Sequence, residues 1–146
     1  MKYVSEILKA KGHEVWWVTP DTSVFDALKV MADKNVGALL VLEADKLVGI
    51  FSERDYARKV ILKGKYSKNT PVKEIMNQKV VYVRPEHSIE ECMALMTGKR
   101  IRHLPVLKEN RLIGMISIGD VVKTIISEQE FTIKQLENYI TGTQTR

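Results

Sequence analysis

The chain has 146 residues, of which 45% are hydrophobic and 28% charged, and its formal net charge at pH 7 is +5. This composition is typical of one soluble globular domain, and no apolar run approaches the roughly 20 residues that a membrane-spanning helix needs. A single cysteine, Cys92, excludes both an internal disulfide and a cysteine-rich zinc site, so we expect a cytoplasmic protein.

The first half of the chain alternates β-rich and helical patterns. Short apolar runs bounded by polar turn residues are typical of strands, whereas apolar residues that recur every three or four positions indicate an amphipathic helix. The opening residues mix charged and apolar side chains, which favours a short helix over a signal peptide. The expected elements are a helix at 4–8, a strand at 15–18, a helix from Ser23 to residues 35–37, a hairpin of strands 38–42 and 47–51, and a helix from about Asp55.

The second half repeats the same patterns. Thr70 and Pro71 are typical of an N-cap and the first position of a leading helix. Ser88 and Glu91 match a capping box, in which each side chain accepts a hydrogen bond from the other residue's backbone N–H. Cys92 falls on the apolar face of the helix that follows, so we expect it to be packed rather than reactive. The expected elements are a leading helix from Pro71, a strand at 80–83, a helix from Ser88 to about Gly98, a hairpin of strands 104–107 and 112–116, and a helix from about Asp120.

The two halves are an internal duplication without a gap. Residues 18–56 lie over residues 83–121, sixty-five positions later. A duplicated unit of this size builds two similar half-domains whose apolar faces pack together. We therefore predict an α+β fold of two β-α-β-β-α repeats, 1–66 and 67–126, packed as a pseudo-two-fold pair with paired clefts. The remaining residues, 127–146, are expected to form a C-terminal helical tail.

One heptapeptide occurs in both repeats at equivalent positions. Residues 49–55 and 114–120 each begin with glycine, place serine fourth and end with aspartate. Glycine lets another group approach the backbone closely, and the positive end of the helix that follows favours an anion such as phosphate. A carboxylate on the first turn can accept hydrogen bonds from two neighbouring hydroxyls, as a ribose presents. The alternative is that the serines and aspartates are only helix N-caps.

These motifs, in register and each between an apolar hairpin and a helix, resemble the tandem CBS-domain pair known as a Bateman module. The resemblance covers roughly residues 1–126. In that family the aspartate holds the ribose of an adenosine-containing nucleotide, and the preceding strand borders the adenine. The resemblance therefore implies an adenine-nucleotide ligand (AMP, ADP, ATP or NAD) and no catalytic cofactor. The residues it implies at the nucleotide are Thr19, Gly37, Ala38, Leu39, Ser52, Arg54, Asp55, Arg102, His103, Leu104, Pro105, Ser117, Gly119 and Asp120.

The two expected clefts are not equivalent. Arg54 is placed for phosphate, whereas its counterpart in the second repeat, Gly119, brings no charge. Arg102 stands where the first repeat has Gly37. We therefore expect one cleft to be roomier and the other more basic, so that the two could take different nucleotides.

The primary hypothesis is a stand-alone regulatory module that passes nucleotide occupancy to an unidentified partner protein and is not an enzyme. Neither an activated nucleophile with its base nor a phosphate loop with lysine occurs in the sequence. The three histidines lack the spacing of a metal site, so no metal is expected. The resemblance also implies a homodimer. An apolar stripe in the tail offers a self-association surface at Ile126, Ile133, Leu136 and Ile140.

Two other functions stay open. A structural module could join copies of the chain without any ligand. A nucleic-acid-binding protein could use the basic run between residues 56 and 73, which contains no acidic residue, together with Trp16 and Trp17. The simpler interpretations are a solvated linker for the basic run, and strand alternation that points one tryptophan at the core.

Overall fold

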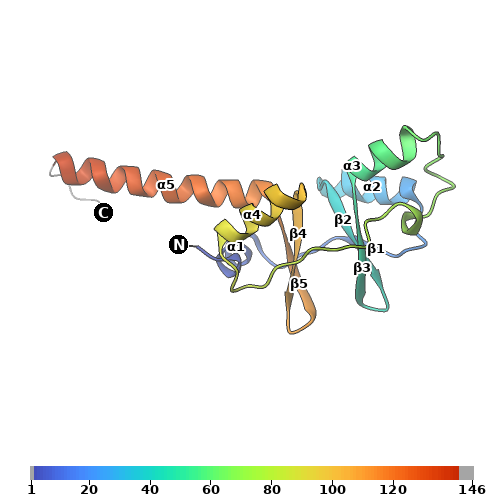
Figure 1. The fold of residues 1–146 in the computed structure, drawn as a ribbon, viewed down its shortest axis with the longest axis horizontal. Helices are drawn as coiled ribbons and strands as arrows, with labels where there is room; N and C mark the ends of the chain where they lie inside the picture. The colour runs from blue at the N-terminus through green and yellow to red at the C-terminus, as the bar shows by residue number, and fades with distance from the viewer. Residues whose placement is uncertain (1, 142–146) are drawn as a thin grey trace.

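The computed structural model describes residues 2–141 of the chain. Figure 1 shows two hairpins near each other, with helices around them and one long helix that extends away from the rest. The first half contains α1 (Val4–Lys11), β1 (Trp17–Val18), α2 (Val24–Lys34), β2 (Ala38–Glu43), β3 (Lys46–Ser52), α3 (Glu53–Tyr56) and the π-helix η1 (Ala57–Ile61). The second half contains the 3₁₀ helix η2 (Val72–Glu74), α4 (Ile89–Lys99), β4 (His103–Lys108), β5 (Arg111–Ser117) and α5 (Ile118–Thr141).

The two hairpins have equivalent register, as a duplicated sequence requires. β2 pairs antiparallel with β3, and β4 with β5, and a register shift interrupts the pairs at equivalent places, after Val41 and after Val106. Both central residues of each turn have positive φ, 50° and 65° in the first hairpin and 51° and 65° in the second. Positive φ at both positions is typical of the type I′ turn, whose twist matches that of the strands. The predicted hairpins are therefore confirmed in both repeats.

The strand expected at residues 80–83 is wrong, and Pro105 explains why. In the first repeat β1 runs parallel to β2, and the N–H of Leu40 donates to the carbonyl of Trp16 at 3.1 Å. Pro105 is the counterpart of Leu40 and has no N–H, so the equivalent hydrogen bond is lost. Of these four residues only Val83 forms a bridge to β4. In the part of the chain that the structure describes, the second sheet therefore has two strands where the first has three.

The capping predictions are confirmed in part. The N–H of Glu91 donates to Ser88 Oγ at 3.1 Å, and the N–H of Ser88 donates to the Glu91 carboxylate at 3.0 Å, which confirms the capping box. The prediction for Thr70 is wrong, because its hydroxyl donates to the carbonyl of Tyr66 at 2.8 Å and Pro71 takes the N-cap position of η2.

Helix α4 ends later than the sequence suggested. It continues past Gly98, and Arg100 ends it in the left-handed conformation with a φ of 55°. Cys92 lies fully buried on its inner face. Burial raises the pKa of the Cys92 thiol to about 11, so the packed role expected for this residue is confirmed.

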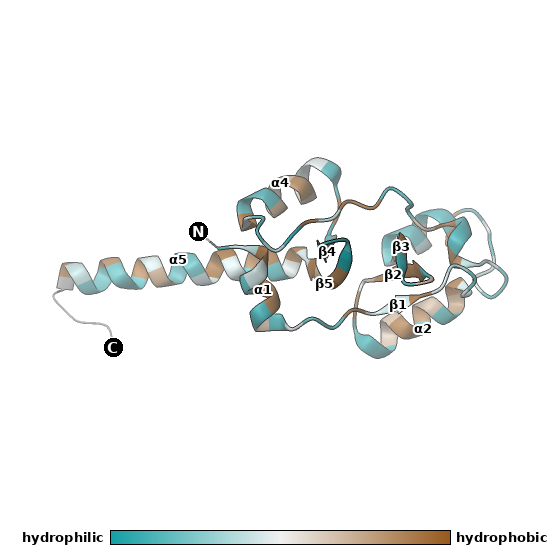
Figure 2. Cartoon of the chain, turned by 90° about the horizontal axis from the view of Figure 1, so that it is seen from below, coloured by the Kyte–Doolittle hydropathy of each residue, from teal (hydrophilic) through white to brown (hydrophobic). Residues whose placement is uncertain are grey.

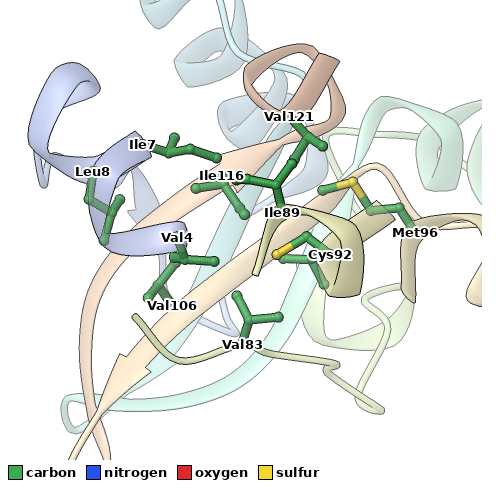
Figure 3. Packing of buried hydrophobic residues seen from close by; sticks show 11 residues of the cluster. Val4, Ile7, Leu8, Val83, Ile89, Cys92, Met96, Val106, Ile116 and Val121 are labelled. Atoms are coloured by element: carbon green, nitrogen blue, oxygen red, sulfur yellow. The ribbon is translucent and has the colours of Figure 1, made fainter. Parts of the chain in front are cut away.

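The buried side chains form two hydrophobic clusters, one for each repeat, and each cluster contains a leading segment from elsewhere in the chain. Figure 3 shows Val4, Ile7 and Leu8 of α1 among buried residues of the second repeat. Val72 and Ile75 join the cluster of the first repeat. This exchange interlocks the two repeats. The predicted boundary between the two repeats, at residues 66 and 67, divides the sequence rather than the hydrophobic clusters, and it stays a prediction.

The motif glycines make room for these leading segments. A Cβ atom on Gly114 would lie 2.6 Å from Leu8 Cδ2, and one on Gly49 would lie 2.5 Å from Met76 Sδ. Packed atoms in folded proteins do not approach so closely. The group that the glycine admits is therefore a side chain of the leading segment in each repeat.

The tryptophan pair and the described part of the tail match their predicted exposure, and residues 142–146 of the predicted tail lie outside the described residues. Trp16 packs against the first hydrophobic cluster, whereas Trp17 is 51% exposed. The outer part of α5 carries apolar and polar residues in turn, as Figure 2 shows. Its predicted apolar stripe is exposed along its whole length. No helix within residues 2–141 is long and apolar enough to cross a membrane.

Candidate functional site

A cleft of about 750 Å³ lies between the two repeats. The first repeat contributes Gly37, the end of β3 and the start of α3, and the second contributes residues 77–81 and the loop from α4 to β4. This volume falls within the range of ligand pockets, roughly 300–1,000 Å³. The apolar part of its lining consists of Ile50, Val80, Val81 and Ile101.

Ser52 and Asp55 line this cleft where β3 ends and α3 begins. The N–H and the hydroxyl of Ser52 donate to Asp55 Oδ2 at 2.9 and 3.1 Å, and the N–H of Asp55 donates to Ser52 Oγ at 3.2 Å. The pair therefore caps the helix, as the simpler interpretation of the motif proposed. The other carboxylate oxygen, Oδ1, lies 3.3 Å from Lys59 Nζ. Oδ1 has the capacity to accept further hydrogen bonds, because a carboxylate oxygen carries two lone pairs.

Cationic side chains from both repeats line the cleft and outnumber its two acids, Glu53 and Asp55. Arg54 Nη1 donates to the carbonyl of Arg100 at 3.4 Å, so the two repeats touch at this point. Cations gathered in a cleft concentrate the positive potential and favour an anionic ligand. The cationic residues are Arg54, Arg58, Lys79, Lys99, Arg100 and Arg102.

Gly37 and His103 meet in the cleft from opposite repeats. A Cβ atom on Gly37 would lie 3.7 Å from Nε2 of His103 and 3.3 Å from Oε1 of Glu53, so any side chain here would narrow the cleft. Burial lowers the pKa of His103, and the charges of Lys11 and Arg102 outweigh the opposite effect of Asp120. The imidazole is therefore neutral at pH 7 and offers one donor and one acceptor nitrogen. This corner suits a flat, uncharged heterocycle.

Ser117 and Asp120 repeat the capping geometry at the start of α5. The N–H and the hydroxyl of Ser117 donate to Asp120 Oδ2 at 2.8 and 3.1 Å, and Lys11 Nζ donates to the same oxygen at 2.6 Å. Burial raises the pKa of the Asp120 carboxyl, but the hydrogen bonds from Lys11 and Ser117 outweigh burial and hold the pKa below its ordinary value. Asp120 lines a separate hollow of about 260 Å³ between α1 and α5.

The structure brings part of the predicted set together. The residues that line the large cleft are Gly37, Ser52, Arg54, Asp55, Arg102 and His103. The others are Ala38, Leu39, Leu104 and Pro105, which are buried in strands, Thr19, which is exposed and hydrogen-bonded to Thr22, and Ser117, Gly119 and Asp120 around the start of α5. The expected assignment of Gly37 to a roomier cleft and Arg102 to a more basic one is wrong, because both residues line the same cleft. The hollows at Asp55 and Asp120 nevertheless differ in size, about 750 and 260 Å³.

Several lining residues were missed by the sequence analysis. Arg58 was detectable, because it lies four residues after Arg54 and therefore on the same helical face. Lys79 and Arg100 gave no local signal, since they reach the cleft only through the packing of the second repeat on the first. The same holds for Lys11 at Asp120. No group of three or more candidate metal ligands occurs within residues 2–141.

The family model for the CBS domain matches residues 4–62 and 72–127. The chain belongs to the CBS-domain family. Among curated proteins, the mitochondrial CBS domain-containing protein CBSX3 of Arabidopsis thaliana is 45% identical over 95% of this chain and 72% of its own length. The two-repeat CBS interpretation of the sequence is therefore confirmed.

Two solved structures share the fold of this CBS pair. A CBS-domain protein of Burkholderia ambifaria, assigned to signal transduction, is 54% identical with a TM-score of 0.85, over 88% of this chain and 96% of its own. The hexameric CBS-CP12 protein of bloom-forming cyanobacteria is 33% identical with a TM-score of 0.73, over 82% and 70%. The predicted α+β architecture of two repeats and a C-terminal helix is therefore confirmed.

Proposed function

We propose that this CBS pair is a non-catalytic regulatory module that binds an adenine nucleotide in the cleft between its repeats and reports occupancy to a partner protein. The observation that carries the proposal is the meeting, in one cleft, of the Asp55 carboxylate with cations from both repeats. The carboxylate is suited to ribose hydroxyls, and the cations are suited to phosphate.

The adenosine part of the ligand is assigned to the side of the cleft that carries Gly37 and His103. Gly37 has no side chain that would narrow this part of the cleft, and the neutral imidazole of His103 can donate to or accept from a ring nitrogen. Asp55 would hold the ribose hydroxyls through Oδ1. CBS domains are associated with adenosine-containing ligands, and these contacts support such a ligand here.

The phosphate part is assigned to the cationic side of the cleft. Arg54 belongs to the first repeat and Arg100 to the second, and the Arg54 side chain donates to the Arg100 carbonyl. A chain of phosphates between them would neutralise like charges that otherwise repel. The ligand would also tie together two repeats that have separate hydrophobic clusters. A change in their relative placement is the signal that a partner could read, since binding favours the arrangement that holds the ligand better.

The proposal predicts that affinity rises with the number of phosphates. Calorimetric titration of the wild-type protein should show that ATP binds more tightly than AMP, and AMP more tightly than adenosine. Arg54→Gln should weaken ATP binding about tenfold, because a hydrogen bond to a charged group contributes roughly 1.5–3 kcal/mol. Lys63→Gln is the matched control, since it also removes a cation, from the basic run between residues 56 and 73, and Lys63 does not line the cleft.

Two outcomes would contradict this proposal. Equal affinities for ATP and adenosine would remove the phosphate role of the cations, and the absence of any binding below millimolar concentration would remove the function itself. A third outcome would favour nucleic-acid binding. In that case the protein would bind oligonucleotides, its affinity for them would fall steeply as the salt concentration rises, and Arg54→Gln and Lys63→Gln would weaken that affinity equally.

We also propose that the CBS pair self-associates through α5. The outer part of this helix exposes large apolar side chains, among them Ile133 at 55% and Ile140 at 81%. Ile126, Ile133 and Ile140 recur every seven residues. Val122 lies four residues before Ile126 and Leu136 lies between Ile133 and Ile140, and such a heptad of branched residues with leucine favours pairing of two helices. The CBS-CP12 relative is a hexamer, which supports an assembly of this chain as well.

Light scattering coupled to gel filtration tests the self-association. The wild-type protein should have at least twice the chain mass of 16.7 kDa. Ile133→Glu should shift it towards the monomer, because a charge would be buried in the seam. Phe131→Glu adds the same charge outside the heptad seam and should leave the mass unchanged. A monomeric wild-type protein would rule this surface out.

A further inference from the structure

Lys11 contacts the carboxylate of Asp120, which is the group that a ribose in the second repeat would need. Its Nζ donates to the carbonyl of Met115 at 2.8 Å and to Asp120 Oδ2 at 2.6 Å. Lys11 is the last residue of α1 and lies far from Asp120 in the sequence. The contact exists because α1 packs into the hydrophobic cluster of the second repeat.

The first repeat treats the equivalent carbonyl differently. Ile50 is the counterpart of Met115, and its carbonyl accepts from the backbone N–H of Asn77 at 2.9 Å, while its own N–H donates to the Asn77 carbonyl at 3.0 Å. The backbone of Asn77 therefore satisfies this part of β3, and Asp55 lines the cleft. Asp55 also has a lysine neighbour, since Lys59 Nζ lies 3.3 Å from its Oδ1, but Lys59 does not line the cleft. In the second repeat the Lys11 ammonium, rather than a backbone N–H, donates to the equivalent carbonyl of Met115, and it also donates to Asp120.

The Lys11–Asp120 contact is held firmly. Oδ2 of Asp120 accepts from Lys11 and from two groups of Ser117, and the Asp120 side chain is only 25% exposed. Beside it, His13 Nδ1 donates to the carbonyl of Ile113 at 2.8 Å, which fixes the segment after α1 against β5. A ribose would have to displace the ammonium, and separating a partly buried ion pair leaves an uncompensated charge on each side.

We propose that Lys11 closes the second ligand position, so that the chain binds one nucleotide, at Asp55, and that removal of the Lys11 ammonium opens a second position at Asp120. The inference rests on the proposed nucleotide-binding function and deepens it. Lys11 is then the residue that decides which of the two duplicated motifs takes a ligand.

The stoichiometry of ATP binding tests the inference. Calorimetry should give one ATP per wild-type chain and two for Lys11→Ala. Asp55→Ala should keep only the weakened first position, and the double variant Lys11→Ala/Asp55→Ala should add one tighter position, at Asp120. Lys9→Ala is the matched control, because Lys9 lies exposed on the same helix, and it should keep the wild-type value of one. The comparison of the double variant with Asp55→Ala isolates the second position, so its result does not depend on the first cleft.

The outcomes separate this inference from the proposed function. A double variant that binds ATP no more tightly than Asp55→Ala overturns the role of Lys11, whatever the wild type does. A wild type that binds none, with a double variant that binds one, removes the function at Asp55 and supports the role of Lys11. A wild type that binds two, one of them lost in Asp120→Ala, also overturns the inference.

A second measurement needs no ligand. Carbon-detected NMR should show that Lys11→Ala raises the pKa of the Asp120 carboxyl above its wild-type value, because the hydrogen bond and charge that lower it are gone. Lys9→Ala should leave that pKa unchanged. An unchanged pKa in Lys11→Ala would mean that the contact is absent in solution and would overturn the inference.

Discussion

Asp55→Ala is expected to weaken ATP binding by at least tenfold. Asp55 lines the cleft and is the carboxylate that the motif has in both repeats, and its Oδ1 is the oxygen assigned to the ribose hydroxyls. A hydrogen bond to a charged group contributes roughly 1.5–3 kcal/mol, and each 1.4 kcal/mol corresponds to about a factor of ten in affinity. Calorimetric titration of both proteins with ATP measures the loss directly.

Asp120→Ala is a closely matched comparison. It removes the equivalent carboxylate and the same type of helix cap, but Asp120 lies outside the cleft lining. ATP affinity should therefore change by less than about a factor of two, while both variants lose a similar capping contribution to stability, about 0.5–2 kcal/mol. The wild type should also prefer ATP to 2′-deoxy-ATP, and Asp55→Ala should lose this preference. A preference that survives in Asp55→Ala would contradict the ribose assignment.

Much of the fold was predictable because its signals are local. The type I′ turns follow from short polar linkers between apolar runs, and the capping box follows from Ser88 and Glu91, which are three residues apart. The missing strand at residues 80–83 was the instructive error. Pro105 was visible in the sequence, but its effect on a parallel neighbour depends on which N–H faces that neighbour, and this becomes clear only from the equivalent bond of Leu40.

The site was predictable only within each repeat. The motif alone predicted that Ser52 ends a strand and that Asp55 lies in the first turn of a helix, and the structure has both there. Their role at a nucleotide stays a prediction. Which residues of the second repeat lie opposite Ser52 and Asp55 depends on how the two repeats pack against each other. The docking brings Arg102 and His103 to the cleft of Asp55, and the exchange of leading segments brings Lys11 to Asp120. Neither contact can be predicted from the spacing of residues within one segment of the sequence.

The exchange of leading segments predicts that Leu8→Ala destabilises the second repeat, although Leu8 precedes the first repeat's own strands. Leu8 is 1% exposed and packs over Gly114 on β5. Truncating a buried leucine typically costs about 2–5 kcal/mol of unfolding free energy, because it removes buried area and leaves a cavity. Denaturant unfolding measures the loss. Leu62→Ala is the control, since Leu62 is 78% exposed and such substitutions usually stay within about 0.5 kcal/mol.

Hydrogen exchange then locates the effect. Val4, Ile7 and Leu8 share one cluster with Ile116 and Val121, whereas β2 and β3 belong to the other. In Leu8→Ala the amides of β4 and β5 should therefore lose protection more than those of β2 and β3, because local opening reports the stability of each cooperative unit. The opposite ranking, with β2 and β3 weakened first, would mean that α1 stabilises its own repeat. In that case the packing of α1 on the second repeat, which brings Lys11 to Asp120, would be absent in solution.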